Sequence, residues 1–212
     1  MIKSINKILA FFAFFISFIV YVSTMAPTAS LWDCGEFIAT SYKLGVPHQP
    51  GAPFYILLGN FISNIPIFEN IGARVNLISP IASSFSVMFL YLIIINILEY
   101  FKGPSKNNID IVTNNVSAFI GAMTFAFTDS HWFNAVESEI YALSTFFTAI
   151  VIWLILKWAH ETNEDSWNSR YLLLIAYMIG LASGVHLLNL LAIPFITLII
   201  FFKKFGNKKD KT

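Results

Sequence analysis

Long apolar runs alternate with short polar segments along most of this 212-residue chain. Runs of about twenty residues with almost no charge have the length that an α-helix needs to cross the hydrocarbon core of a bilayer. The last two runs meet at Gly184, His186 and Asn189, so they are expected to form either a hairpin or one long broken helix. The pattern predicts six spanning segments, at 8–24, 75–101, 114–129, 138–158, 171–186 and 188–204.

Two shorter apolar stretches lie between the first and second predicted spans. Residues 36–46 can form a small helix with Phe37, Ile38 and Tyr42 on one side, and residues 53–65 are apolar but too short to span. The linker VPHQPGAP between them is too rich in proline and glycine to be helical. Both stretches are expected to be helices that lie along the membrane surface.

Composition supports a membrane protein. The chain is 57% hydrophobic and only 12% charged, whereas soluble domains are about 45–50% apolar and about 25% charged. The first apolar run exceeds the usual signal-peptide core of roughly 7–15 residues, so we interpret it as a retained signal anchor. The expected fold class is all-α: a polytopic bundle of about six spans over 1–204, followed by a basic cytoplasmic tail at 205–212.

Lysine and arginine residues are distributed unevenly between the loops. With six spans, most of them fall on one side of the membrane, which the positive-inside rule assigns to the cytoplasm together with both termini. A bacterial-type inner membrane is the expected location. The residues on that side are Lys3, Lys7, Lys102, Lys106, Lys157, Arg170 and the lysines after residue 202.

The opposite, extracytoplasmic side receives acids and three of the four histidines. Asp33 and Glu36 are three residues apart and would share a face of a helix. They are candidates for a general base with a supporting partner, or for metal ligands. The alternative is helix capping, with Asp33 as the N-cap and Glu36 as its partner. Cys34 between them is interpreted as a small filler residue rather than a nucleophile.

Four further polar positions carry two interpretations each. His48 either bonds a substrate or is merely exposed in its loop. Arg74 either reaches lipid headgroups or binds a phosphate, with Asn76 as a near neighbour on its helix. His186 and Asn189 either face a substrate or form a buried structural pair.

Several classes of protein are excluded or disfavoured by what the chain lacks. It has no HExxH zinc signature, no P-loop, no GxGxxG fingerprint and no GxSxG elbow, and its one cysteine excludes a disulfide framework. A net charge of +1 gives no reason to expect nucleic-acid binding. A transporter is disfavoured because the acids cluster at one face and no inverted repeat is visible.

Four motifs resemble a family of multispanning protein O-mannosyltransferases of the GT-C superfamily. The first, APTASLWDCGEFIATSYKLGVPHQPGAP at 26–53, is specific, and the other three follow in the family's order over nearly the whole chain. They are RVNLISP at 74–80, HWFNAVESEIYAL at 131–143 and Gly-Val-His at 184–186. The resemblance covers only the N-terminal module, because family members continue with further spans.

The resemblance implies transfer of a sugar, expected to be mannose, from a polyprenyl-phosphate donor to a serine or threonine hydroxyl of an extracytoplasmic protein. Asp33 is implied as the base of an inverting reaction with Glu36 beside it, and Arg74 as the group that holds the leaving phosphate. Residues implied to position donor or acceptor are His48, Asn76, Glu139, Tyr141, His186 and Asn189. No cofactor or metal ligand set is expected. The alternative is a non-catalytic subunit or fragment that binds polyprenyl lipid or depends on a C-terminal partner chain.

Overall fold

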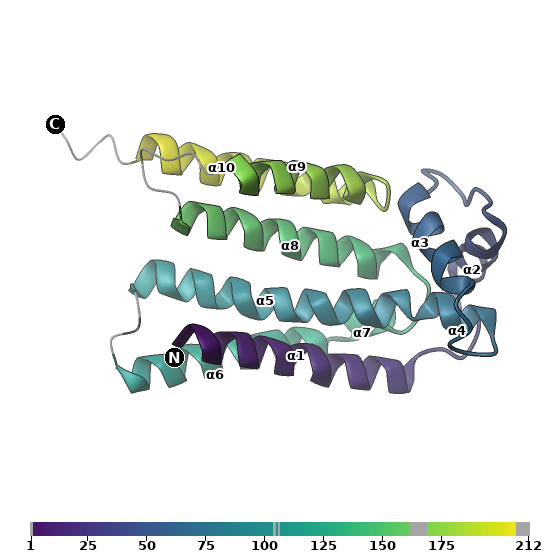
Figure 1. Cartoon of the computed structure of the whole chain (residues 1–212), viewed down its shortest axis with the longest axis horizontal. Helices are drawn as coiled ribbons and strands as arrows, with labels where there is room; N and C mark the ends of the chain where they lie inside the picture. The colour runs from purple at the N-terminus through teal and green to yellow at the C-terminus, as the bar shows by residue number, and fades with distance from the viewer. Residues whose placement is uncertain (1, 104, 106, 162–168, 207–212) are drawn as a thin grey trace.

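The computed structural model describes residues 2–103, 105, 107–161 and 169–206. The described part is helical apart from its turns and loops, which confirms the all-α prediction (Figure 1). Residues 207–212 of the expected basic tail lie outside the described residues. The helices are α1 (Ile2–Thr24), α2 (Cys34–Lys43), α3 (Pro53–Ser63), α4 (Ile71–Asn76), α5 (Ile78–Lys102), α6 (Asn108–Ala126), α7 (Asp129–Ala135), α8 (Ile140–Glu161), α9 (Ser169–Ser183), the 3₁₀ turn η1 (Leu187–Leu191) and α10 (Ala192–Phe205).

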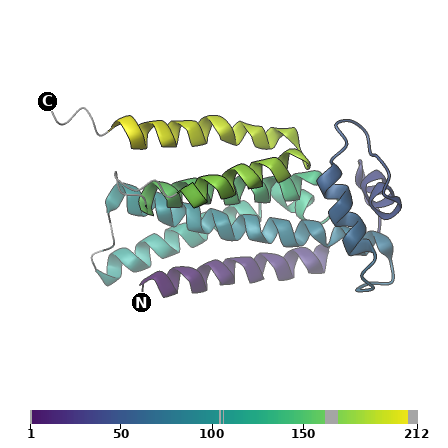
Figure 2. The same ribbon diagram turned by 45° about the horizontal axis from the view of Figure 1, so that its top comes forward.

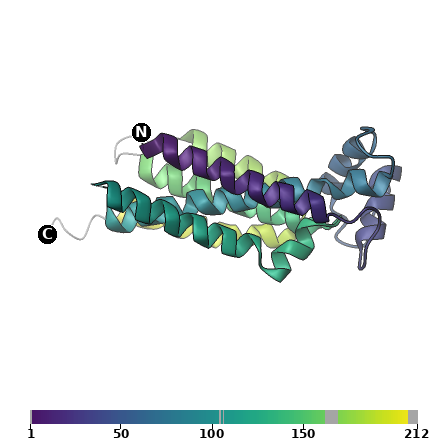
Figure 3. The same ribbon diagram turned by 90° about the horizontal axis from the view of Figure 1, so that it is seen from below.

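The long helices run roughly parallel or antiparallel to one another and form an elongated bundle (Figures 1, 2 and 3). Helices α2, α3 and α4 gather at one end of this bundle, where α1 ends and α5 begins. The start of α1 and the end of α10 lie at the other end. The polar first loop is therefore separated from the basic chain ends by the length of the bundle.

Within the described residues, five helical segments are long and apolar enough to cross a membrane, namely Ile5–Thr24, Ile71–Lys102, Asn108–Ala126, Ile140–Glu161 and Leu187–Phe205. The fifth predicted span, 171–186, corresponds to α9, whose 15 residues rise about 22 Å, less than the roughly 30 Å of a bilayer core. The chain reverses direction between α9 and α10, so the last two apolar runs form a hairpin and not one broken helix (Figure 2).

Helix α6 begins six residues before the predicted start of the third span. Its first turn is capped by the Asn107 side chain, which accepts a hydrogen bond from the Asp110 N–H at 2.8 Å. Asn114 and Asn115 within the helix are buried, and Asn115 accepts a hydrogen bond from the Tyr91 hydroxyl of α5. Hydrogen bonds within the bundle make these buried polar residues compatible with a helix. The residues that the prediction left out are the first six of α6, which include Asn108, Asp110 and Thr113.

Among the described residues, three apolar clusters hold the bundle together. One joins α1, α5 and α6, and another joins α8, α9 and α10. The third lies beneath α2 and α3, where Phe37 and Tyr55 pack against Val75, Ile140 and Val185. This third cluster connects the first loop to the beginnings of α5 and α8 and to the turn after α9.

Helices α2 and α3 pack against each other without space for a larger side chain. A Cβ atom at Gly59 of α3 would lie 2.7 Å from the Ser41 Cβ of α2. The neighbouring Asn60 amide donates hydrogen bonds to the carbonyls of Ser41 and Tyr42 at 2.9 and 3.2 Å. The missing side chain and the amide together fix the position of α2, which carries the first acids.

Candidate functional site

Asp33 lies immediately before α2, with a side chain that is 58% exposed. It occupies the N-cap position, but its side chain makes no capping hydrogen bond. The Glu36 carboxylate bonds to His48 instead of turning back toward Asp33. The capping interpretation of this acid pair is therefore not realised, and the Asp33 carboxylate is open to a ligand.

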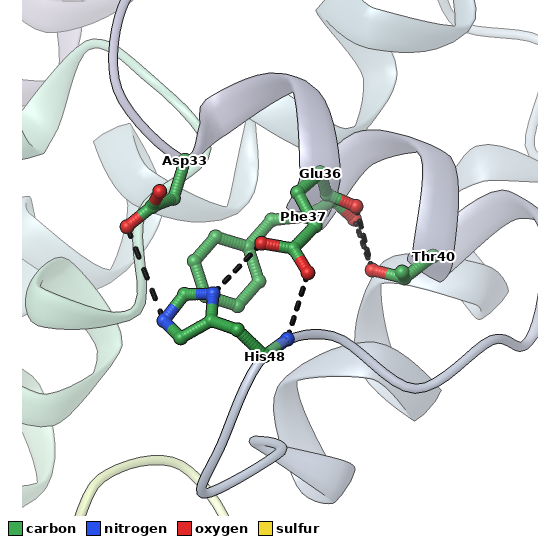
Figure 4. A network of polar contacts seen from close by, with 5 residues as sticks. All are labelled: Asp33, Glu36, Phe37, Thr40 and His48. Carbon is green, nitrogen blue, oxygen red and sulfur yellow. Dashed lines mark hydrogen bonds and ion pairs between the residues drawn. The ribbon is translucent and has the colours of Figure 1, made fainter.

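Glu36 and His48 form a two-point contact (Figure 4). The His48 backbone N–H donates to Glu36 Oε1 at 2.7 Å, and Nδ1 of the His48 ring lies 2.7 Å from Oε2. The same ring lies 5.8 Å from the Phe37 ring, which is buried beneath it. A loop histidine that could have been merely exposed is thus fixed to α2 by its backbone and its ring.

The other ring nitrogen of His48 faces Asp33. Nε2 lies 4.0 Å from Asp33 Oδ2, as the dashed line in Figure 4 shows. The hydrogen bond that the ring donates to Glu36, supported by the charges of Glu36, Asp33 and Glu139, raises the pKa of His48 above its usual value. The hydrogen bonds from His48 lower the pKa of Glu36.

Glu139 lies at the inner edge of this group, immediately before α8, and is only 5% exposed. Burial, followed by the negative charges of Asp33 and Glu137, raises its pKa to about 7. A hydrogen bond from the Asp33 backbone and the charge of His48 act in the opposite direction. Glu139 is therefore a carboxyl group that can change its protonation state near neutral pH.

Backbone strain is concentrated around these residues. In the described part of the chain, the non-glycine residues with positive φ are Trp32 (59°), Leu44 (51°) and Ala52 (43°). Each such conformation costs on the order of 1 kcal/mol and persists only where the surrounding structure enforces it. Trp32 and Ala52 flank the segment that carries Asp33, Glu36 and His48, and Leu44 lies within it.

Asn76, at the end of α4, is a fully buried connection between distant segments. Its amide donates to the carbonyls of Ala26 and Thr28 at 2.7 and 3.0 Å. Its carbonyl oxygen accepts from the Ser138 hydroxyl and lies 3.7 Å from Cys34 Sγ. Cys34 is itself buried, in agreement with its interpretation as a filler residue.

Arg74 lies two residues before Asn76 and bonds to backbone. Nε donates to the Phe68 carbonyl at 2.6 Å, and the two terminal nitrogens donate to the carbonyls of Ser63 and Glu69 at 2.9 and 3.3 Å. The guanidinium group therefore holds the loop between α3 and α4. Three of its five N–H groups are used in this way.

The remaining predicted residues lie near the turn between α9 and α10. The rings of Tyr141 and His186 are in contact at 5.4 Å, and burial lowers the pKa of His186. Asn189 is buried: it accepts hydrogen bonds from Ser144 and Thr148 of α8 and donates to the carbonyls of Ala182 and His186.

The structure thus brings Asp33, Glu36, His48 and Glu139 into one group, which we call the acid–histidine group. The other predicted residues make their hydrogen bonds and ring contacts elsewhere.

Sequence reasoning missed Ser138 and the bond between the Ser30 hydroxyl and Glu137. The Glu-Ser-Glu run before α8 was the available signal, but a run of alternating polar residues does not say which of them turn inward.

The acid–histidine group is rich in hydrogen-bond acceptors. Across the described residues, no lysine or arginine nitrogen lies within 4.0 Å of its carboxylates. One ligand atom each from Asp33, Glu36 and His48 lie within 4.8 Å of one another, close enough to surround a metal ion. However, both oxygens of Glu36 already accept hydrogen bonds from His48, which a metal would have to displace. The exposed carboxylate and imidazole can accept hydrogen bonds and protons from a hydroxyl-bearing substrate.

The chain is similar to protein O-mannosyl-transferases of two organisms. The chain is 26% identical over 195 residues to the "Protein O-mannosyl-transferase tmem260" of Dictyostelium discoideum, covering 86% of this chain and 22% of that protein. It is 22% identical over 183 residues to the "Protein O-mannosyl-transferase TMEM260" of Mus musculus, covering 86% of this chain and 24% of that protein. The chain spans less than a quarter of the length of these two relatives. No solved structure is significantly similar.

The match to a family model is more extensive. The model described as "Protein O-mannosyl-transferase TMEM260 N-terminal domain" matches residues 33–209, from Asp33 to beyond α10. It includes every predicted site residue and covers most of the chain. The chain therefore belongs to the family of the protein O-mannosyl-transferase TMEM260 N-terminal domain.

Proposed function

We propose that this protein is a GT-C type membrane glycosyltransferase that moves mannose from a polyprenyl-phosphate donor to a serine or threonine hydroxyl of a protein. The observation that carries the proposal is the half-exposed Asp33 carboxylate, which makes no capping bond and faces His48 at 4.0 Å, in a chain of this family. An exposed carboxylate that makes no capping bond suits a proton acceptor better than a structural cap.

In the proposed reaction, Asp33 removes the proton of the acceptor hydroxyl as the oxygen attacks the anomeric carbon. The bond between that carbon and the phosphate oxygen breaks on the opposite side, so the configuration inverts. Asp33 is held in place by its backbone bond to Glu139 and by the strained turn at Trp32. No cofactor takes part in this step.

The leaving phosphate needs a positive group, and Arg74 is the proposed one. Its three bonds to backbone carbonyls fix the guanidinium plane and leave two N–H groups for a phosphate. Tyr141 and His186 are proposed to contact donor or acceptor through their partly exposed rings. Asn76 and Asn189 hold the segments around these residues in place through their buried hydrogen bonds.

The proposed orientation places the acid–histidine group outside the cytoplasm and both chain ends inside. The support is the position of Lys102, Lys203 and Lys204 near the end of the bundle opposite to α2, α3 and α4 (Figure 1). The donor then reaches Arg74 from within the bilayer, and the protein acceptor reaches Asp33 from the aqueous side.

A partner-dependent subunit is the second candidate. It is favoured by the coverage of the curated relatives, of which this chain matches 22 and 24%. In that case the chain contributes the acid–histidine group and lipid binding, and a C-terminal partner chain supplies acceptor recognition. The two candidates differ in whether this chain transfers sugar alone.

The test uses membranes that contain this chain, radiolabelled polyprenyl-phosphate mannose and a serine- and threonine-rich acceptor peptide. We expect transfer to the peptide, and its loss in Asp33→Asn at unchanged protein level. Glu69→Gln, which changes an exposed carboxylate in the loop before α4, is the matched control and retains transfer. Absence of transfer by correctly inserted wild-type chain contradicts a self-sufficient enzyme and supports the partner-dependent subunit.

A further inference from the structure

The two-point contact between Glu36 and His48 does more than fix a loop. The backbone N–H of His48 donates to Oε1 and its ring contacts Oε2, so the carboxylate holds the imidazole in a single orientation (Figure 4). A carboxylate at 2.7 Å from Nδ1 keeps a proton on that nitrogen. The lone pair of the neutral ring is then on Nε2, the nitrogen that faces Asp33.

The separation of 4.0 Å between Nε2 and Asp33 Oδ2 is too long for a direct hydrogen bond, which spans about 2.7–3.2 Å. It is short enough for one oxygen atom to contact both groups at ordinary hydrogen-bond distances. Both side chains are about half exposed, at 48% for His48 and 58% for Asp33, so a water molecule or a substrate hydroxyl can reach the gap. A carboxylate, a bridging oxygen and an oriented imidazole form a continuous path for a proton.

We propose that His48 accepts the proton that Asp33 removes from the acceptor hydroxyl, and that Glu36 is the positioning residue that holds His48 for this transfer. The inference rests on the proposed function and adds the route by which Asp33 is reset. The acceptor O–H bond breaks and its proton moves to Asp33. It then passes through a water molecule in the gap to Nε2, and the resulting imidazolium releases a proton to the solvent.

The charged groups around His48 favour this order of events. Glu36 from α2, Asp33 from the turn before α2 and Glu139 from the segment before α8 are all negative when ionised, and each raises the pKa of His48. The uncharged Phe37 ring packs on the remaining side. The imidazolium formed by the transfer is thus stabilised by three carboxylates, and its half exposure allows the proton to leave.

The first test is the pH dependence of transfer in wild type and Glu36→Gln. The reaction needs neutral His48, so activity falls as the pH is lowered through the pKa of His48. Replacing Glu36 by glutamine lowers that pKa, and the acidic limb of the profile should move to lower pH. A merely structural role of Glu36 would lower activity equally at every pH, so an unmoved limb overturns the proposal.

A second test is chemical rescue. We expect His48→Ala to reduce kcat more than tenfold while leaving the KM of the acceptor peptide nearly unchanged. Added imidazole should restore activity in proportion to its concentration, whereas Asp33→Asn should gain nothing. If imidazole fails to restore a folded His48→Ala protein, or if EDTA abolishes wild-type transfer and Mn²⁺ restores it, the relay is overturned.

A third measurement does not depend on transfer and separates failure of the inference from failure of the proposed function. Nitrogen-15 NMR of His48 in detergent-solubilised protein should show the tautomer with the proton on Nδ1 and a raised pKa. Both features should diminish in Glu36→Gln. If wild type shows this tautomer and this raised pKa but transfers no mannose, the proposed function fails while the orientation of His48 by Glu36 holds. If the proton is on Nε2 instead, the inference about Glu36 and His48 is overturned.

Discussion

Glu36 and Glu139 show how the surroundings of one residue type determine what it can do. Glu36 is 37% exposed and accepts two hydrogen bonds from His48, so it stays ionised and its pKa is lowered. Glu139 is buried beside the charges of Asp33 and Glu137, so its pKa is raised to about 7. The first side chain is suited to orient a neighbour, and the second is suited to exchange a proton near neutral pH.

The buried carboxyl group of Glu139 has a consequence for stability. Its pKa rises from 4.5 in the unfolded reference to about 7 in the folded chain. The unfolded chain therefore ionises first as the pH increases, and the free energy of unfolding falls between these two values and levels off above about pH 7. A shift of this size corresponds to at most about 3 kcal/mol.

We therefore expect Glu139→Gln to raise the melting temperature at pH 8, by a few degrees, and to change it little at pH 4.5. Thermal unfolding of the detergent-solubilised protein at the two pH values measures the difference. Glu69→Gln, at an exposed position, should follow wild type at both. Equal effects of Glu139→Gln at both pH values would contradict a raised pKa.

Asn76 is the residue whose loss should cost most in stability. Asn76→Ala leaves the carbonyls of Ala26 and Thr28 and the hydroxyl of Ser138 without their buried partner. Each unsatisfied buried group costs about 1–3 kcal/mol, so we expect destabilisation of about 2 kcal/mol or more, seen as a lower melting temperature. The control is Asn64→Ala, which removes an exposed amide that bonds only its own helix; an equal loss in both variants would show that Asn76 has no special role.

Among the elements, the contact of α2 with α3 determines where the acid–histidine group lies. Glu36 is on α2, whereas His48 is in the loop that leads into α3, so their contact depends on the spacing of the two helices. Gly59 allows that spacing because it has no side chain toward Ser41.

We expect Gly59→Ala to separate α2 from α3, because its Cβ would lie 2.3 Å from Ser41 Oγ and 2.7 Å from Ser41 Cβ. The variant should be less stable and should lose the Glu36–His48 contact, measured by melting temperature and by the NMR signal of His48. Gly180→Ala is the control, since a Cβ there meets open space; in a helix it should be neutral or stabilising by up to about 1 kcal/mol.

Combining Ser41→Gly with Gly59→Ala should restore much of the lost stability. The change Ser41→Gly removes the side chain that the methyl group added at position 59 would contact. If the combined variant is no better than Gly59→Ala alone, steric contact with Ser41 is not the cause of the defect.

The elements of this fold could be predicted from sequence more completely than the contacts between them. Long apolar runs identify helices directly, and the short helices α2 and α3 were recognisable from length and spacing. The start of α6 was missed because its first six residues include Asn108, Asp110 and Thr113, which are polar in sequence. For the acid–histidine group, proximity of Asp33, Glu36 and His48 in sequence was informative, whereas the backbone bonds of Arg74 depend on how the loop at 63–69 folds.

At the scale of the whole molecule, the bundle separates two chemically different ends. Helices α2, α3 and α4 form one end, and Lys102, Lys203 and Lys204 lie near the other (Figures 1 and 3). Labelling can test the proposed orientation, because the single native cysteine, Cys34, is buried and can be replaced.

In a Cys34→Ala background, we expect Val46→Cys to react with a membrane-impermeant maleimide in intact cells, since residue 46 is 86% exposed beside the acid–histidine group. Asn108→Cys, exposed at the start of α6, should react only after the membrane is permeabilised. The reverse pattern would place the acid–histidine group in the cytoplasm and exclude the proposed sidedness.

The hydrogen bond from the Phe54 N–H to the Gly184 carbonyl, at 2.8 Å, joins the beginning of α3 to the turn after α9. A ribosome must therefore add about 130 residues after Phe54 before this bond can form, which takes roughly 7–26 s at about 5–20 residues per second. During that interval Asp33, Glu36 and His48 have already been made while one support of their loop is missing. The order of synthesis thus makes the acid–histidine group one of the last parts of the nascent protein to reach its final form.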